Sequence, residues 1–150
     1  MRKRGVISER LYKKILEVIP IPCVDVVLVC RGKFLLGKRN NKPARGTWWF
    51  VGGRIFKGER LEEAACRKIK EETGLTNIKI KKLLTARETI FRNSAQGPSS
   101  HTVNCVFLVE VSTNLLDRDN EQNSKLEWFS RVNSRWPKYV KDMLGLAGFK

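Results

Sequence analysis

The stretch Gly53–Leu75, GRIFKGERLEEAACRKIKEETGL, decides how the rest of the chain is interpreted. Residues 61–73 within it predict a helix, because Ala, Glu, Lys and Arg dominate and Gly74 follows where a C-terminal cap belongs. At about 100° per residue, Glu72 points into the same sector as the apolar residues Leu61, Ala65 and Ile69. We therefore expect a carboxylate that faces the body of the protein.

A carboxylate aimed into the protein is costly unless a cation pairs with it. A divalent metal ion is one partner for Glu72, and a nearby Arg or Lys is another. Arg67 lies four residues before Glu71, so a contact along the helix is available, as in an ordinary amphipathic helix with salt-bridged acids. The preceding Gly52 and Gly53 are expected to break a short strand and bring carbonyl oxygens, which hard cations bind, near the helix.

This segment resembles the Nudix box, G-x5-E-x7-R-E-U-x-E-E-x-G-U, in which U is a bulky apolar residue. The matching positions are Gly53, Glu59, Arg67, Ile69, Glu71, Glu72, Gly74 and Leu75. Lys68 stands where the pattern has Glu, and an ammonium group has no lone pair to offer a metal. The resemblance implies an α+β Nudix fold, with a mixed β-sheet sandwiched between α-helices. It also implies a Mg²⁺ or Mn²⁺ site and the hydrolysis of nucleoside diphosphate derivatives.

Within the box, the resemblance gives each charged residue an expected role. Glu71 and Glu72 would bind the metal ion, and Arg67 and Glu71 would belong to the catalytic group. Arg67 would orient the glutamates, whereas Glu59 would be mainly structural.

A longer stretch, Phe34–Leu75, resembles the GDP-mannose mannosyl hydrolases, which are Nudix enzymes that attack the sugar carbon instead of phosphorus. These enzymes also lack the first glutamate of the box, so Lys68 fits them better than the main family. The metal ligands that this resemblance implies are the carbonyl of Gly52, Glu72 and Gln122. Catalytic and substrate-binding roles are implied for Arg39 and Arg54 at the diphosphate, and for Asp25 at the base or sugar.

The residue types suit these roles, but each has a simpler explanation. A guanidinium fork fits phosphate oxygens, although Arg39 and Arg54 could equally be solvated surface charges. Asp25 lies in an apolar strand, where a buried pair with an arginine would account for it. Gln122 lies in a polar loop and, apart from the resemblance, is a weak candidate ligand, since hard-metal sites favour carboxylates.

The general base is the main departure from the sugar-cleaving enzymes. They carry a histidine just after the loop glutamine, whereas this chain has Asn123, which accepts no proton near neutral pH. His101 is the only histidine, and a polar residue at a strand end is its simpler interpretation. Glu88 and Glu121 are the other candidate bases.

Composition sets broader expectations. The 150 residues predict a single Nudix domain over 1–150, with no apolar run of the ~20 residues that span a membrane. A basic N-terminus without an apolar stretch is not a secretory signal, and four cysteines without a C-x-x-C pair indicate reduced thiols in a cytoplasmic protein. The net charge of +15 attracts polyanions, although a generally basic surface without a dedicated partner explains it as well.

Hydrophobic patterning and turn residues predict the remaining elements. Helices are expected at 8–19 and 135–144, in addition to 61–73. Strands are expected at 23–30, 33–38, 48–51, 77–87, 101–111 and 126–129.

Three functions follow from these expectations. The first is hydrolysis of a nucleotide sugar such as GDP-mannose, which releases GDP and the sugar. The second is cleavage at phosphorus of ADP-ribose, a nucleoside triphosphate or an RNA 5′ end; Glu71 supports it, because the sugar-cleaving enzymes commonly lack that acid. The third is non-catalytic binding of nucleotides or RNA. A homodimer through the N-terminal helix is also open.

Overall fold

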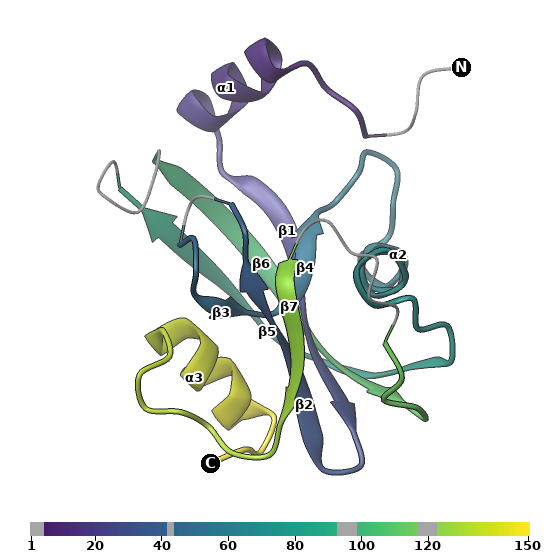
Figure 1. Ribbon diagram of the computed structural model, residues 1–150. Helices are drawn as coiled ribbons and strands as arrows, with labels where there is room; N and C mark the ends of the chain where they lie inside the picture. Colours follow the sequence, from purple (N-terminus) through teal and green to yellow (C-terminus); the bar gives the residue numbers. More distant parts are fainter. Residues whose placement is uncertain (1–4, 42–43, 93–98, 117–122) are drawn as a thin grey trace.

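The computed structural model describes residues 5–41, 44–92, 99–116 and 123–150. Figure 1 shows one curved sheet with α2 against one face and α3 against the other, and with α1 set apart at one end. The helices are α1 (Glu9–Val18), α2 (Leu61–Thr73) and α3 (Lys138–Leu146). The strands are β1 (Ile21–Cys30), β2 (Lys33–Arg39), β3 (Trp48–Trp49), β4 (Val51–Arg54), β5 (Ile78–Phe91), β6 (Ser100–Val111) and β7 (Asn123–Phe129).

Strand β1 is the centre of the sheet. The hydrogen-bonded order is β3-β2-β1-β6-β5, with β4 paired to β1 and β7 paired to β2. The β1–β6 pair is parallel, whereas the other strand pairs described are antiparallel, so the sheet is mixed. A tight turn joins β1 to β2, and Arg31 and Gly32 both adopt positive φ angles there, as a two-residue hairpin turn requires.

Alternating side chains of β1 supply two separate hydrophobic cores. Val24, Val26 and Leu28 pack towards α2, whose contribution to that core includes Ala65 and Ile69. The opposite core contains Val27 of β1 and gathers aromatic and aliphatic side chains under α3, namely Phe34, Trp49, Phe50, Trp136, Val140, Met143 and Leu144. The expected α+β fold, a mixed sheet between helices, is therefore confirmed.

Several element boundaries differ from the expectations: β1 begins at Ile21 and β7 at Asn123, earlier than predicted, and three further differences have a clear cause. Gly52 and Gly53 do not break the strand: they lie inside β4, because their backbone pairs with Asp25 and Val24 of β1. Strand β5 continues to Phe91, since its pairing with β6 runs that far. Helix α3 begins at Lys138, because the residue before a proline is disfavoured in the helical region and Pro137 itself is extended, with ψ 145°.

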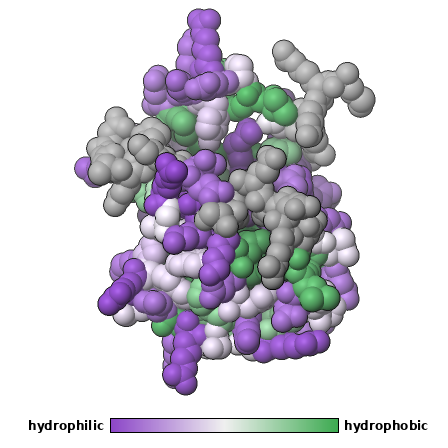
Figure 2. Space-filling model, in the orientation of Figure 1, coloured by the Kyte–Doolittle hydropathy of each residue, from purple (hydrophilic) through white to green (hydrophobic). Residues whose placement is uncertain are grey.

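Helix α1 contacts the rest of the molecule lightly. It contains no buried residue. The guanidinium of Arg54 lies 5.5 Å from the centre of the Tyr12 ring and donates a hydrogen bond to the carbonyl of Gly5, just before the helix. Hydrophilic side chains cover much of the face seen in Figure 2, with apolar side chains gathered in a few patches. Among the described residues, each helix is too short or too polar to cross a membrane.

Candidate functional site

The inner face of α2 carries an acid where helical periodicity predicts one. Only 3% of Glu72 is exposed, so its carboxylate points into the protein. Its cationic partner is Lys68, whose Nζ lies 3.0 Å from Glu72 Oε1. The lysine is itself 5% exposed. A metal ion and a nearby basic side chain are the two partners expected for Glu72. The structure shows the basic side chain, Lys68.

Glu71 lies at the rim of the same face, with 45% of its side chain exposed. Lys68 Nζ and Arg67 Nη1 each approach its Oε2 at 3.3 Å. The i,i+4 contact that the sequence predicts between Arg67 and Glu71 is therefore present. Two adjacent carboxylates, one buried and one accessible, share the cations of one helical turn.

Arg67 ties α2 to the loop that precedes it. Its Nε and Nη2 donate to the two carboxylate oxygens of Glu59 at 2.6 and 3.0 Å, and Nη2 also donates to the carbonyl of Arg54 at 2.9 Å. The guanidinium lies 3.7 Å from the centre of the Phe56 ring. Such a fixed, bidentate arrangement holds the glutamate-bearing turn at a defined distance from β4.

The diglycine of β4 is shaped by what lies against it. A side chain at Gly52 would collide with the carbonyl of Val24 and the carboxylate of Asp25, so close approach of two strands requires glycine there. Gly53 has φ 155°, and a Cβ at this position would lie 2.9 Å from Cε of Lys68. Both glycines line the neighbouring pocket, so they form the boundary between it and the α2 acids.

The donor chemistry of this region fits Mg²⁺, which prefers oxygen ligands and keeps several waters. Glu71 and Glu72 would hold the ion, with the carbonyl of Gly52 as a further oxygen donor. Glu59 is engaged by Arg67, and the described part of the chain has no group of three or more His, Cys, Asp and Glu side chains arranged for a metal. The proposed ligand Gln122 lies outside the described residues.

A pocket of about 250 Å³ opens beside the diglycine, with Asp25 among its lining residues. Asp25 is 5% exposed and accepts a 2.7 Å hydrogen bond from the hydroxyl of Tyr139. Burial raises the pKa of Asp25 to about 7, while the Tyr139 bond, the charge of Arg39 and a bond from Trp49 lower it. The partners that hold Asp25 therefore include an aromatic hydroxyl and an indole, and the charge of Arg39 also acts on this acid.

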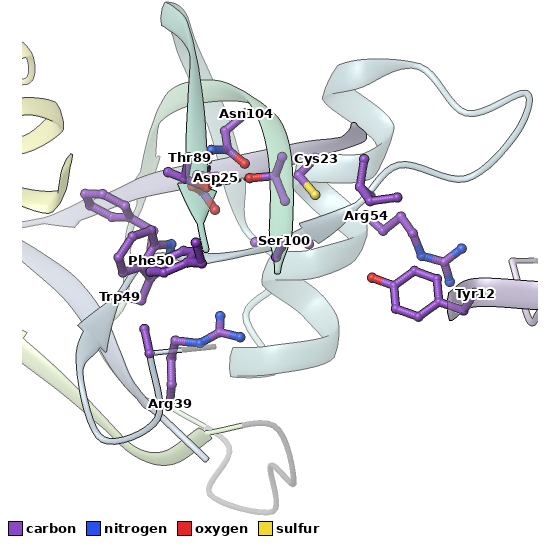
Figure 3. A pocket seen from close by; sticks show the side chains of 16 residues that line it. Tyr12, Cys23, Asp25, Arg39, Trp49, Phe50, Arg54, Thr89, Ser100 and Asn104 are labelled. Atoms are coloured by element: carbon purple, nitrogen blue, oxygen red, sulfur yellow. Dashed lines mark hydrogen bonds between the residues drawn. The ribbon is translucent and has the colours of Figure 1, made fainter. Parts of the chain in front are cut away.

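Aromatic and amide groups complete this pocket, which is shown in Figure 3. The ring of Trp49 stacks on Tyr139, with 5.1 Å between ring centres and 11° between planes. Asn104 hydrogen-bonds the Tyr139 hydroxyl and donates to Thr89 at 3.4 Å. Sequence reasoning missed Trp49, Asn104 and Tyr139, because they lie on three separate elements and share no motif.

Arg39 and Arg54 both line the pocket, as their expected role at a diphosphate requires. Figure 3 shows them on different elements, with Arg39 below the aromatic residues and Arg54 beside Tyr12. Their guanidinium charges both lower the pKa of the Cys23 thiol, which burial raises to about 12. The pocket therefore combines a buried acid of raised pKa with two cations that can face phosphate oxygens.

The candidate bases lie elsewhere. Ser100 and Thr102 line the pocket, so His101 between them points to the other face of β6. Glu88 is exposed and lines a second cavity of about 710 Å³, which shares Trp49, Thr89 and Phe91 with the first. Glu121 and the side chain of Asn123 are outside the described residues.

Comparisons with known proteins identify the family of this chain. The NUDIX domain model matches residues 20–138. ADP-ribose pyrophosphatase of Methanocaldococcus jannaschii is 36% identical over 111 residues, which are 74% of this chain and 60% of that protein. The low-salt glycan biosynthesis protein Agl8 of Haloferax volcanii is 35% identical over 135 residues, which are 89% of this chain and 85% of that protein.

A solved structure gives the same result. The MutT NUDIX hydrolase from Burkholderia pseudomallei superposes with a TM-score of 0.65 and 25% identity, covering 85% of this chain and 98% of that one. The chain therefore belongs to the NUDIX domain family of hydrolases.

Proposed function

We propose that this chain is a Mg²⁺-dependent hydrolase of nucleoside diphosphates joined to a second group, with a nucleotide sugar such as GDP-mannose as substrate. One observation carries the proposal: Arg39 and Arg54 line the same pocket as Asp25, and the diglycine that also lines it lies against Lys68, beside the acids of α2. Cations that suit a diphosphate therefore line the same pocket as hydrogen-bonding groups, next to a candidate metal site.

The two cavities suit a substrate with two parts. They share Trp49, Thr89 and Phe91, so a ligand can extend from one into the other. Aromatic faces at this junction favour stacking with a planar base, and Asp25 and Asn104 can hydrogen-bond polar groups of the base or sugar. The relatives named above are an ADP-ribose pyrophosphatase and a glycan biosynthesis protein, and both names agree with this class of substrate.

The residues of the chain have distinct tasks in the proposed reaction. Arg39 and Arg54 orient the diphosphate and stabilise its charge as it leaves, because preorganised donors are most effective where charge develops. Arg67 fixes Glu71 relative to Glu59 and β4. The Mg²⁺ ion, when bound, supplies further neutralisation of the leaving diphosphate. With water as the nucleophile, GDP departs with the bonding electrons and the sugar gains a hydroxyl group.

Cleavage at phosphorus is the second candidate. Glu71 favours it, because an accessible acid beside Glu72 supplies the second carboxylate that the sugar-cleaving enzymes commonly lack. For ADP-ribose or a nucleotide sugar the products would then be two phosphate monoesters, and for a nucleoside triphosphate a monophosphate and pyrophosphate, rather than GDP and a free sugar.

The test is a panel of GDP-mannose, ADP-ribose and nucleoside triphosphates, incubated with the chain and Mg²⁺ in ¹⁸O-water and separated by chromatography. We expect turnover of GDP-mannose with the label on the sugar hydroxyl. Label on phosphate would instead support the second candidate, cleavage at phosphorus. No turnover of any compound, together with retardation of RNA in a gel at moderate salt, would refute the enzyme and favour a binding protein.

A further inference from the structure

Lys68 is buried, unlike a typical lysine at a protein surface. Only 6% of its side chain is exposed, and its Nζ is 3.0 Å from Glu72 Oε1 and 3.3 Å from Glu71 Oε2. Lysine is almost never buried unless it is paired, and here the ammonium group lies between two carboxylates on one helical turn. The charge of Lys68 is therefore held at the carboxylates that are the candidate metal ligands.

The contact differs from an ordinary pair along a helix. Most such pairs lie on the solvent side and favour Glu before Lys, because this order suits the helix dipole. Lys68 instead precedes Glu72 and pairs on the buried side. The stem also has room made for it: a side chain at Gly53 would lie 2.9 Å from Cε and 3.3 Å from Cδ of Lys68. Two elements therefore accommodate this lysine, which indicates a role beyond helix stability.

The charge count around α2 shows what the lysine changes. We define the α2 cluster as Glu59, Arg67, Lys68, Glu71 and Glu72, which at neutral pH contains three negative and two positive charges. Glutamate at position 68, as in the Nudix box, would lower the net charge by two units. That difference equals the charge of one divalent ion.

The field of Lys68 also reaches the substrate pocket. Burial raises the pKa of the Cys23 thiol to about 12, and the charges of Arg54, Lys68 and Arg39 act in the opposite direction. Cys23 lines the pocket. Lys68 therefore acts on the pocket together with the two arginines that face it.

We propose that the Lys68 ammonium is a built-in cation of this site, and that it takes the place of one divalent ion that the site would bind if residue 68 were an acid. This inference rests on the proposed function, because it concerns the same metal site. It follows that the chain binds fewer divalent ions than a variant with glutamate at position 68. It also follows that Lys68, rather than a metal ion, supplies the positive charge next to Glu72.

The test counts Mn²⁺ ions bound to the purified chain without nucleotide, by electron paramagnetic resonance of free Mn²⁺ during a titration. Lys68→Glu is compared with Lys70→Glu, which makes the same change of charge at an exposed position of the same helix. We expect Lys68→Glu to bind one more Mn²⁺ ion than the natural chain. Its affinity for Mn²⁺ should be at least ~10-fold tighter than that of the natural chain, since a carboxylate adds an oxygen ligand. Lys70→Glu should change affinity less than ~2-fold, since exposed charges are screened.

A second variant provides a test that does not depend on the folding of Lys68→Glu. Lys68→Met keeps the length of the stem but removes the charge, which leaves Glu72 without its local cation. Mn²⁺ should then raise the thermal unfolding temperature of Lys68→Met more than that of the natural chain, because metal binding to the folded state compensates the buried acid. Lys70→Met should show the same Mn²⁺ response as the natural chain.

Two outcomes would overturn the inference. One is equal Mn²⁺ stoichiometry and affinity in Lys68→Glu and Lys70→Glu, and the other is an equal Mn²⁺ response of the unfolding temperature in Lys68→Met and Lys70→Met. A chain that hydrolyses GDP-mannose but shows either outcome keeps the proposed function and loses only the role of Lys68. A chain that shows the expected Mn²⁺ counts but hydrolyses nothing loses the proposed function alone.

Discussion

The α2 cluster and the Asp25 pocket lie on either side of the diglycine, and they solve the burial of polar groups in opposite ways. The α2 cluster uses full charges, with Arg67 and Lys68 set against three glutamates. The Asp25 pocket uses hydrogen bonds from a hydroxyl and an indole, under a raised pKa. The α2 cluster suits a metal cation, whereas the hydrogen-bonding part of the pocket suits polar groups of a base or sugar, beside the two arginines that suit a diphosphate.

The largest expected effect removes the buried acid of the α2 cluster. Glu72→Gln should lower turnover of the substrate found in the panel at least ~100-fold, because loss or misplacement of a catalytic metal has effects of this size. Glu62→Gln, an exposed change on the same helix, should leave turnover unchanged. Full activity of a folded Glu72→Gln variant would remove the metal site from the mechanism.

The next effect concerns Asp25 and depends on pH. Because folding raises the pKa of Asp25 from 3.8 to about 7, the folded state binds the extra proton between these values. The free energy of unfolding should therefore fall as pH rises, by about 2 to 3 kcal/mol between pH 5 and pH 8 from this group alone. Asp25→Asn should lose that slope in urea denaturation at the two pH values.

Asp142→Asn is the matched control for this slope. Its hydrogen bond from Lys138 lowers the pKa of Asp142 below 3.8, so this group is already ionised in both states above pH 5. Its removal should leave the slope between pH 5 and pH 8 unchanged. An identical slope in Asp25→Asn and the natural chain would contradict the raised pKa of Asp25.

A smaller effect tests the connection between α2 and β4. Arg67→Met removes the hydrogen bonds to Glu59, Glu71 and the carbonyl of Arg54, and leaves the well-buried Glu59 without this partner. We expect a loss of about 2 kcal/mol in the free energy of unfolding, within the range for hydrogen bonds to charged groups in a partly exposed setting. Lys70→Met should change this free energy by less than about 0.5 kcal/mol.

The smallest effect isolates one hydrogen bond of the pocket. Tyr139→Phe keeps the ring that stacks on Trp49 and removes the donor to Asp25, so it should cost about 1 kcal/mol in urea denaturation at pH 8. In the Asp25→Asn background this cost should shrink, and the difference measures the coupling of the two groups. Equal costs in both backgrounds would show that the bond does not stabilise the ionised acid.

The two regions also differ in how far sequence reasoning reaches. Helix α2 begins and ends where composition and Gly74 predict, and the burial of Glu72 follows from helical periodicity alone. All these signals lie within one short segment, where a helix fixes the relative directions of its side chains. The roles expected of Gly52, Arg39 and Arg54 at the substrate remain predictions.

The Asp25 pocket depends on contacts that local patterns do not encode. Tyr139 is 114 residues from Asp25 in sequence, and it reaches the acid only because α3 packs on the face of the sheet where Asp25 lies. The strand-breaking role expected for the diglycine was wrong for the same reason, since pairing with β1 decides where β4 ends. Tertiary packing determines both the contact of Tyr139 with Asp25 and the extent of β4. No spacing of residues in the sequence indicates this packing.

The parallel pairing of β1 with β6 has a consequence for the kinetics of folding. Partners in this ladder, such as Ile21 and Thr102, are about 80 residues apart, whereas a two-residue turn joins β1 to β2. The hairpin can form within microseconds, but the centre of the sheet must await closure of a long loop. During synthesis, the edge of β1 that pairs with β6 therefore stays unpaired until β6 has left the ribosome, and an unpaired strand edge favours aggregation.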